Sequence, residues 1–544
     1  MDWSLFVKIV IIIIYLGVIA VLGVMGYRRT KTAGDYLLGG RKIHPMIMAL
    51  SYGATFISTS AIVGFGGTAG VFGFSLLWLT FLNIFLGVFI AFIFFGKRTR
   101  RIGRNLNAHT FPEFLGKRYQ SSFVQKFAGW VIFIFMPIYT AAVMIGVSKF
   151  LESSLGLPYD VVLLIFAVIV AAYVFFGGMK GVMYSDAFQG SLMLLGMTVL
   201  IIAVYAQLGG IAPAHKQLTE LAANPAIAEQ ISGFQAGGFQ GWTSMPTLFS
   251  QNWWVVISTI VMGVGIGVLA QPQLAVRFMT VKSDKELNRA VPIGGVFILM
   301  MTGVAFVVGA LSNVLFFNAQ GSIAVVAAGG TDSIIPAFLG NFMPEWFVTA
   351  FLIILLAAGM STISSQFHAI GTAVGRDIFK IKETDSKKGL LVSRLGVLVA
   401  IVVTIALSYV LPTIWEGAIA SGTALFFGLC CAAFLPMYFG ALYIKKMTKT
   451  AAISGMVAGF SSSLLWMLFF HTKESAVLKL SELIFGVPTL APEGTLLGFV
   501  DPLIISLSLS ILVTIIVQIA SKKRLAADHV DKCFHGVKGN SVSQ

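Results

Sequence analysis

Three serine hydroxyls and one threonine hydroxyl gather in a long apolar segment of the sequence. Ser361, Ser364 and Ser365 are spaced at i, i+3 and i+4, so a helix places all three on one face. Thr362 lies beside that face, and Ala358 contributes a backbone carbonyl one turn earlier. Hydroxyl and carbonyl oxygens in apolar surroundings are ligands that an alkali cation accepts in place of water. The pattern predicts a cation site, although small residues also favour close helix packing in a bilayer.

An acidic residue, Asp186, stands at the start of another apolar segment, beside Ser185. A carboxylate in the middle of a bilayer costs about 2.5–3.5 kcal/mol on insertion scales, so it needs a partner. Two interpretations stay open, a helix N-cap at the inner interface and a counter-charge for a bound cation. Glu416 is expected at the outer interface. His368, one turn past the hydroxyls, is expected to be a packing residue.

Two apolar segments contain residues that disfavour a continuous helix. One holds the glycine-rich stretch 64–73, preceded by Ser58, Thr59 and Ser60, and the other holds 263–267, followed by Gln-Pro-Gln at 271–273. Glycine costs about 1 kcal/mol in a helix and proline about 3 kcal/mol, so both segments are predicted to unwind within the membrane. Unwound backbone is tolerated there only where it is buried or lines a site, and matching breaks in two halves indicate an inverted-repeat transporter. Flexible close packing without transport is the alternative.

The composition places these segments in a membrane. Hydrophobic residues make up 57% of the 544 residues and charged residues only 11%, whereas soluble domains carry about 25% charged residues. Three cysteines, two of them adjacent at 430 and 431, provide neither a disulfide framework nor metal-ligand spacing. The sequence contains no catalytic constellation, so an enzyme is not expected. The fold class predicted is an all-α polytopic membrane protein.

Thirteen apolar runs are long enough to cross a bilayer. They fall at about 5–26, 43–72, 74–96, 124–153, 158–177, 185–208, 250–276, 290–317, 346–372, 390–411, 413–443, 451–470 and 500–520. The first run has no basic region before it and is expected to be a retained span rather than a signal peptide.

The distribution of basic residues predicts the orientation. If the N-terminus is outside, all but five of the 37 Lys and Arg lie on the inner side, as the positive-inside rule requires. The net charge of +15 is therefore a topology signal and not a sign of nucleic-acid binding. The five outer residues are Lys8, Lys149, Lys216, Lys473 and Lys479. A multi-pass protein of the cell inner membrane, with its C-terminus in the cytoplasm, is expected.

Several short motifs occur in an order that resembles the sodium:solute symporter family, which includes proline, pantothenate, sialic acid, sugar and monocarboxylate carriers. The motifs are Asp35 to Arg41, Ala54 to Ser58, Gly177-Gly178 with Ser185 to Gln189, Gln271 to Gln273 with Arg277-Phe278, and Met360 to Thr362 with Arg376-Asp377. The resemblance covers nearly the whole chain. It implies a LeuT-type core of five plus five helices at spans two to eleven.

The resemblance also divides the chain. It implies an extra helix and inner loop at 1–42, a first repeat at 43–208, an outer loop at 209–249, a second repeat at 250–443 and two extra helices with a short tail at 444–544.

The resemblance implies sodium as the coupling ion and assigns its ligands. The main sodium site falls on the carbonyls of Ala54, Ile57 and Ala358 and the hydroxyls of Ser361 and Thr362. Some members bind a second sodium, and those positions fall on Asp186, Ser361, Ser364 and Ser365. No organic cofactor is expected.

The implied substrate region lies along the broken spans. Its residues are Phe56, Ser58, Thr59, Ser60, Tyr139, Val264, Val268 and Pro272. Phe56 stands where proline carriers have an acid, and the two valines stand where they have aromatic residues.

We therefore expect a sodium symporter that imports a small organic acid, a monocarboxylate or a pantothenate-like solute, by alternating access. A sodium/proline symporter or a sodium/sugar or sialic acid symporter is the alternative on the same scaffold. A channel and a membrane sensor are disfavoured, the sensor because the tail is too short for an output domain. Two sodium ions per substrate are expected. The substrate, the oligomeric state and the transport rate are not determined.

Overall fold

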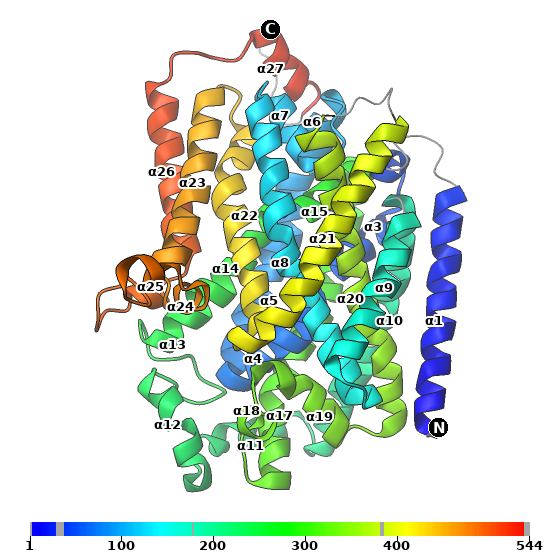
Figure 1. Cartoon of the computed structure of the whole chain (residues 1–544), viewed down its shortest axis with the longest axis vertical. Coiled ribbons are helices and arrows are strands. Elements are labelled where there is room, and N and C mark those ends of the chain that lie inside the picture. The colour runs from blue at the N-terminus through cyan, green and yellow to red at the C-terminus, as the bar shows by residue number, and fades with distance from the viewer. Residues whose placement is uncertain (1–2, 29–36, 177–178, 381–385, 538–544) are drawn as a thin grey trace.

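The computed structural model describes residues 3–28, 37–176, 179–380 and 386–537. Over these ranges the protein is a bundle of helices without β-strands, apart from an isolated bridge between Ile43 and Val281. The motif residues at 35, 36, 177 and 178 lie outside the described residues. The first residues of α1 and the C-terminal helix α27 (Ala527–Phe534) lie at opposite ends of the bundle (Figure 1), as an odd number of spans requires.

Ten helices are long and uninterrupted. They are α1 (Trp3–Arg28), α8 (Ser122–Leu155), α9 (Tyr159–Phe176), α10 (Met179–Gln207), α17 (Val304–Gln320), α20 (Glu345–Thr372), α21 (Ser386–Ile414), α22 (Ala418–Tyr443), α23 (Lys449–Phe469) and α26 (Pro502–Ala520). These helices are mostly apolar, and their backbone N–H and C=O groups form hydrogen bonds within each helix, as a bilayer demands.

The other spans are assembled from consecutive pieces. The first group is α3 (Pro45–Phe56), η2 (Ser60–Gly64) and α4 (Phe65–Phe72), and the second is η3 (Gly73–Leu76), α5 (Leu77–Ile84), η4 (Phe85–Gly96) and α6 (Lys97–Asn105). The third is α13 (Gln251–Trp254), η6 (Val255–Met262), α14 (Gly263–Gly267), η7 (Val268–Ala270), α15 (Pro272–Ala275) and η8 (Val276–Thr280). In addition, α16 (Asp284–Ile298) and η9 (Leu299–Gly303) run into α17, and η11 (Ala373–Ile378) extends α20.

Short helices cover the two ends of the bundle. The end of the bundle that bears α27, which the basic residues predict to be the inner end, carries α7 (Phe111–Arg118). The other end carries α11 (Ile211–Leu221), η5 (Pro225–Ile227), α12 (Ala228–Ala236), α18 (Ala324–Ala327), η10 (Thr331–Ser333), α19 (Ile334–Phe342), α24 (Thr472–Leu478), α25 (Leu480–Phe485) and η13 (Leu497–Phe499).

The number of spans agrees with the sequence-based count. Among the described residues, eleven helical stretches are long and apolar enough to cross a membrane, and the apolar part of α9 is a shorter twelfth. One of the eleven, Ser60–Asn105, contains the second half of predicted span two together with span three. Thirteen predicted spans are therefore represented, and the all-α polytopic fold class is confirmed.

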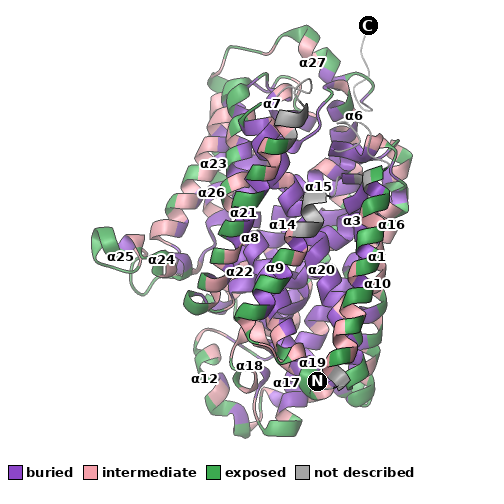
Figure 2. Ribbon diagram, turned by 45° about the vertical axis from the view of Figure 1, so that its right-hand side comes forward, coloured by how far each residue is buried: buried purple, intermediate pink, exposed green. Residues whose placement is uncertain are grey.

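The core of the bundle lies around α20. In the most apolar stretch of 18 residues, 89% of the residues are buried in the span that contains α20, but only 11% are buried in α1. Figure 2 shows the buried interior helices and the exposed outer faces of peripheral helices such as α21 and α23. The helix α8 packs against α20, α21 and α22, and α10 packs against α3 and α20. Functional side chains on α3, α10 and α20 therefore face one another in the interior.

Both predicted helix interruptions exist, but neither lies within its glycine stretch. The first interruption begins at Ile57, whose backbone is extended (φ −92°, ψ 99°), and the second lies at Gln271 (φ −73°, ψ 118°), immediately before Pro272. The residues at 65–72 and 263–267 are helical. The two spans are therefore interrupted as predicted, beside these glycine stretches and not inside them, because close helix packing uses the glycines at 66, 67 and 70.

The close packing is visible at two glycines of α4 and α17. A methyl group added at Gly309 would lie 2.0 Å from the carbonyl oxygen of Gly66, and one added at Gly67 would lie 2.1 Å from that of Thr331. Small residues that let backbones touch are the usual means of helix association in membranes. Gly67 and Gly309 therefore serve close helix packing, the alternative that the sequence left open for small residues.

Candidate functional site

The end of α3 meets the hydroxyl face of α20. Ser361 Oγ donates toward the carbonyls of Ala54 at 2.8 Å and Ala358 at 3.1 Å. Thr362 Oγ1 donates toward the carbonyls of Ala54 at 3.3 Å and Thr55 at 3.1 Å. The last carbonyls of a helix have no intrahelical partner, so the end of α3 offers free acceptors. Two hydroxyl hydrogens face three carbonyls, and this excess of oxygen lone pairs is a suitable donor set for an alkali cation.

The structure brings four of the five predicted main sodium ligands together directly: Ala54, Ala358, Ser361 and Thr362. Ile57 adjoins them at the interruption, where its N–H donates to the carbonyl of Gly53 at 2.7 Å. All of these residues are fully or almost fully buried. The predicted sodium ligands therefore lie in the buried interior, where oxygen ligands would have to replace the hydration shell of an ion.

The predicted second site is centred on a buried ion pair. Asp186 Oδ2 accepts from Arg277 Nη2 at 2.9 Å, from Ser51 Oγ at 2.9 Å and from Thr55 Oγ1 at 3.3 Å. The Arg277 guanidinium also donates to Ser365 Oγ at 2.7 Å. Both charged side chains are at most 1% exposed. In this state a guanidinium lies beside Asp186, at the position predicted for a second sodium.

The other two hydroxyls of the predicted second site bond within their own helix. Ser364 Oγ donates to the carbonyl of Ser361 at 3.2 Å and Ser365 Oγ donates to the same carbonyl at 3.0 Å. Asp186 Oδ1 is buried and has no hydrogen-bond partner among the described residues. Because α10 begins at Met179, Asp186 lies in the helix interior, and the N-cap interpretation is wrong.

Sequence reasoning missed Arg277 as the partner of Asp186, together with Ser51 and Thr55. Two signals were available. A buried carboxylate in a membrane requires an opposite charge nearby, and Arg277 follows the Gln-Pro-Gln interruption by only a few residues. Ser51 and Thr55 are spaced at i and i+4, so one face of α3 presents both hydroxyls.

The predicted substrate region has mostly apolar walls. Phe56 stacks on Phe427, with ring centroids 6.2 Å apart, and Tyr139 meets Phe427 edge-on at 5.2 Å. A methyl group added at Gly87 would touch both Phe56 and Val268, at 3.3 and 3.2 Å. The structure therefore gathers Phe56, Tyr139 and Val268 around Phe427, a residue that sequence reasoning did not select.

The hydroxyls after the α3 interruption have different neighbours. Thr59 Oγ1 donates to the carbonyl of Val143 at 2.7 Å, which joins η2 to α8. Ser58 Oγ accepts from the N–H of Ser60 at 3.1 Å, whereas Ser60 Oγ is buried without a hydrogen-bond partner among the described residues. Val264 is buried on α14. Ser60 is thus the predicted substrate residue with free hydrogen-bonding capacity.

A small cavity of about 30 Å³ extends from the ion pair toward the inner end of the bundle. Pro272, the last predicted substrate residue, lines this cavity beside Arg277 and Ser365. His368 also lines it, so His368 is a cavity residue rather than only a packing residue.

An ion-pair network ties α7 to the inner end of α20. Arg376 donates to both carboxylate oxygens of Glu113, at 2.8 and 3.0 Å, and Lys117 lies 2.7 Å from the same carboxylate. Burial raises the pKa of Glu113, but hydrogen bonds from His109 and Arg376 and the nearby cations outweigh it and hold the pKa well below its usual range. Glu113 is therefore ionised, and α7 is fastened in place.

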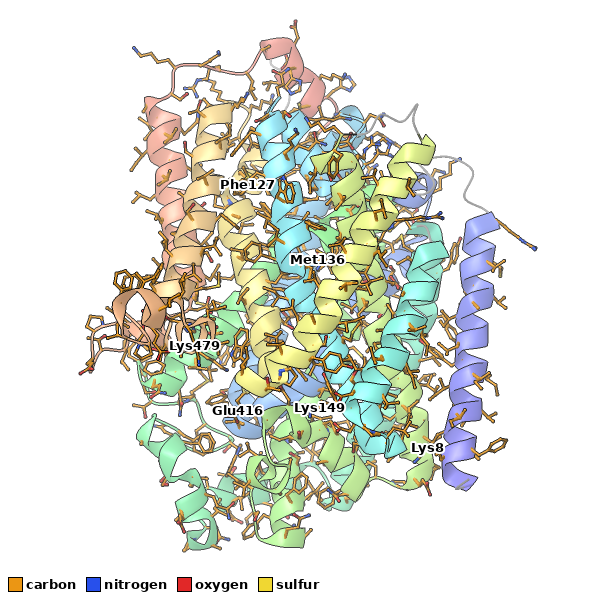
Figure 3. All side chains as sticks on the ribbon, viewed as in Figure 1. Lys8, Phe127, Met136, Lys149, Glu416 and Lys479 are labelled. Carbon is orange, nitrogen blue, oxygen red and sulfur yellow. The ribbon has the colours of Figure 1, made fainter. Side chains whose placement is uncertain are left out.

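A larger cavity of about 350 Å³ opens at the opposite end, among α4, η6, α22 and the segment around Lys473. Glu416 lines it, and Figure 3 shows Glu416 and Lys149 at this end of the molecule. Asp332 accepts from the N–H of Ile419 at 3.4 Å nearby. Burial raises the pKa of Asp332 to about 6, although Lys473 opposes the shift.

A family model and curated relatives both match this chain over most of its length. The model of the sodium:solute symporter family matches residues 36–459. Sodium/proline symporters of Staphylococcus aureus strains JH9 and bovine RF122 are 29% and 28% identical over 553 residues, which cover 96% of this chain and 94% of each relative. The solved structure of a Na+-coupled sialic acid symporter in its substrate-bound, outward-open state has a TM-score of 0.73 at 18% identity, and the match covers 95% and 98% of the two chains. That structural likeness shows a shared fold.

Proposed function

Because the chain belongs to the sodium:solute symporter family, we propose that it imports a small organic solute together with sodium through the interrupted helices α3 and α15. The observation that supports sodium most directly is the convergence of Ser361 and Thr362 on the free carbonyls of Ala54 and Thr55. Alternating access then exposes this buried site first to one cavity and then to the other.

Uptake into proteoliposomes tests the proposal. Purified protein should accumulate labelled solute when an inward sodium gradient is imposed, and it should not do so with potassium in place of sodium. A channel would dissipate the solute gradient without saturation or counterflow, and a sensor would show no flux. Either result would overturn the proposal.

For the substrate, a small amino acid of the proline type is the better supported candidate. The curated relatives that cover nearly the whole chain are sodium/proline symporters. The apolar walls formed by Phe56, Val268 and Phe427 suit a compact aliphatic ring. A carboxylate would be met by the free hydroxyl of Ser60 and by the N-terminus of the helix that η2 begins.

A small monocarboxylate is the second candidate. It rests on Phe56 and on the valines at 264 and 268, three positions that offer no side-chain carboxylate to pair with an ammonium group. Competition by unlabelled proline, acetate, pyruvate, lactate, pantothenate and sialic acid separates the two. Competition by proline alone supports the amino acid, and competition by pyruvate or lactate without proline supports the acid.

The second sodium site remains a proposal with one structural condition. A sodium ion can bind Asp186 Oδ2 only after Arg277 moves away, because Arg277 Nη2 lies 2.9 Å from that oxygen, whereas Oδ1 has no hydrogen-bond partner among the described residues. Two sodium ions carry two charges inward with a zwitterion and one charge with a monoanion, whereas one sodium carries one charge or none, so the substrate must be identified first. The membrane potential contributes about 2.3 kcal/mol per charge per 100 mV, so reversal potentials measured in proteoliposomes give the stoichiometry.

A further inference from the structure

One face of α20 and its extension η11 connects the hydroxyl cluster with the inner end of the bundle. Ser365, His368, Thr372 and Asp377 all line the small inner cavity. The cavity's opposite wall includes Thr110, which precedes α7. An ion that leaves the main sodium site toward the inner end would follow this face.

Asp377 has an incomplete set of partners. Its Oδ1 accepts from Thr110 Oγ1 at 2.8 Å and from Gln125 Nε2 at 2.9 Å. Its Oδ2 is buried and has no hydrogen-bond partner among the described residues, and the side chain is fully shielded from solvent. The adjacent Arg376 is directed to Glu113 instead, at 2.8 Å.

No ion pair with Asp377 is found among the described residues. A buried carboxylate without a counter-charge is strongly unfavourable. Asp186 has a guanidinium and Glu113 has two cations at ion-pair distance. Arg376 and Lys380 act on the charge of Asp377 only through longer-range electrostatics, without an ion pair among the described residues. A cation that enters the cavity meets a free carboxylate oxygen at this point.

We propose that Asp377 is an inner station for sodium, which binds the ion after it leaves the Ser361–Thr362 site and before it reaches the cytoplasm. The inference rests on the proposed sodium symport. Thr110 and Gln125 hold one carboxylate oxygen, and the other oxygen receives the ion. Asp377 is not needed to bind sodium from the outer side.

The Asp377→Asn variant separates this role from a structural one. Asparagine retains Oδ1 as an acceptor for Thr110 and Gln125, removes the charge and replaces the second oxygen by an amide NH2 group, which cannot bind a cation. Asp377→Glu restores the charge. Asp284→Asn is the matched control, since Asp284 is another inner-side acid, paired with Arg100 outside this cavity.

The readout is ²²Na⁺ flux through the full-length protein, oriented one way in liposomes, with proline, pyruvate and pantothenate on both sides. We expect Asp377→Asn to raise the inner sodium concentration for half-maximal efflux at least fivefold and to leave the outer half-maximal concentration within twofold. Asp377→Glu should recover most of the shift, and Asp284→Asn should match the wild type.

Three results would overturn the inner station. The first is an unchanged inner half-maximal sodium concentration in Asp377→Asn. The second is an equal shift of the half-maximal sodium concentration on both sides. The third is a change in the inhibition of efflux by inner protons without a change in its dependence on inner sodium. If Asp377→Asn does not fold, the same inner-side shift must appear in Gln125→Met, which keeps the charge of Asp377 and removes one of the two hydrogen bonds that hold its carboxylate. Absence of the shift in that variant overturns the inference. Absence of sodium flux in the wild type would instead reject the proposed symport itself.

Discussion

At the scale of single residues, the hydroxyls of Ser361 and Thr362 bear the most specific expectation. Each donates to a free carbonyl at the end of α3 within 2.8–3.3 Å. Replacing either one by Ala should raise the sodium concentration for half-maximal uptake about 5- to 150-fold, because losing a buried ligand costs about 1–3 kcal/mol. Sodium titration of uptake measures the change. Ser462→Ala, which removes a hydroxyl from α23 at the periphery, is the control. Wild-type sodium dependence in both site variants would show that sodium binds elsewhere.

The ion pair of Asp186 and Arg277 gives a second expectation at this scale. Arg277→Gln leaves Asp186 and the serine hydroxyls free, so the charge moved per substrate should rise if a second sodium can bind there. The same variant should also lower the free energy of unfolding by about 3–5 kcal/mol, since it leaves a buried charge unpaired.

Reversal potentials and thermal unfolding of the purified protein measure these two effects. The double variant Asp186→Asn/Arg277→Gln removes both charges and should recover much of the stability without the extra charge movement. An unchanged reversal potential in Arg277→Gln, with stability lost, would assign the pair a purely structural role.

At the scale of helices, the contact between α4 and α17 depends on glycine. In Gly309→Ala the new methyl group would lie 2.0 Å from the Gly66 carbonyl oxygen, so the helices must separate. We expect a loss of about 1–3 kcal/mol from overpacking. Gly295→Ala, on α16 with nothing within 4 Å of the added group, should be neutral or stabilising by up to about 1 kcal/mol. Thermal unfolding of both variants in detergent makes the comparison.

The attachment of α7 to α20 through Glu113 has a defined pH dependence. The folded-state pKa of Glu113 is depressed, so its stabilising contribution is present above the unfolded pKa of about 4.3 and declines as the pH falls below it. Glu113→Gln should reduce the free energy of unfolding by up to about 3–5 kcal/mol at pH 7, and the difference from wild type should shrink between pH 4 and 3.

Thermal unfolding at pH 7, 5, 4 and 3 follows this dependence. Glu220→Gln is the control, because the pair of Glu220 with Lys216 is largely exposed and contributes little. A constant difference across the pH range would show that Glu113 acts through packing and not through its charge.

At the scale of the whole molecule, orientation is the property that the basic residues predict. Lys479 lies between α24 and α25, at the ends of α23 and α26 that face away from α27 (Figures 1 and 3), and Lys523 follows α26 on the α27 side. We expect a membrane-impermeant maleimide to label Lys479→Cys in intact cells and Lys523→Cys only after the membrane is opened. The three native cysteines are buried and should give little background. The reversed labelling pattern would place the N-terminus in the cytoplasm.

The sequence by itself determined the class, the number of spans and the hydroxyl face of α20. Apolar length and helical spacing are local properties, and an i, i+3, i+4 set of serines shares a face wherever the helix lies. It also indicated that two spans are interrupted. It did not separate the glycines that pack helices from the residues that interrupt them, because glycine serves both flexible backbone and close packing, and only the neighbours Gly66 and Thr331 distinguish the two uses.

Only the tertiary structure decided which side chains from separate helices meet. Arg277 reaches Asp186 across 91 residues of sequence, and Thr110 reaches Asp377 across 267. No spacing rule links such positions, because each contact depends on how α3, α10, α20 and α7 pack. The same packing leaves Asp377 Oδ2 without a hydrogen-bond partner among the described residues. This property belongs to the assembled interior, because it depends on which donors the surrounding helices supply.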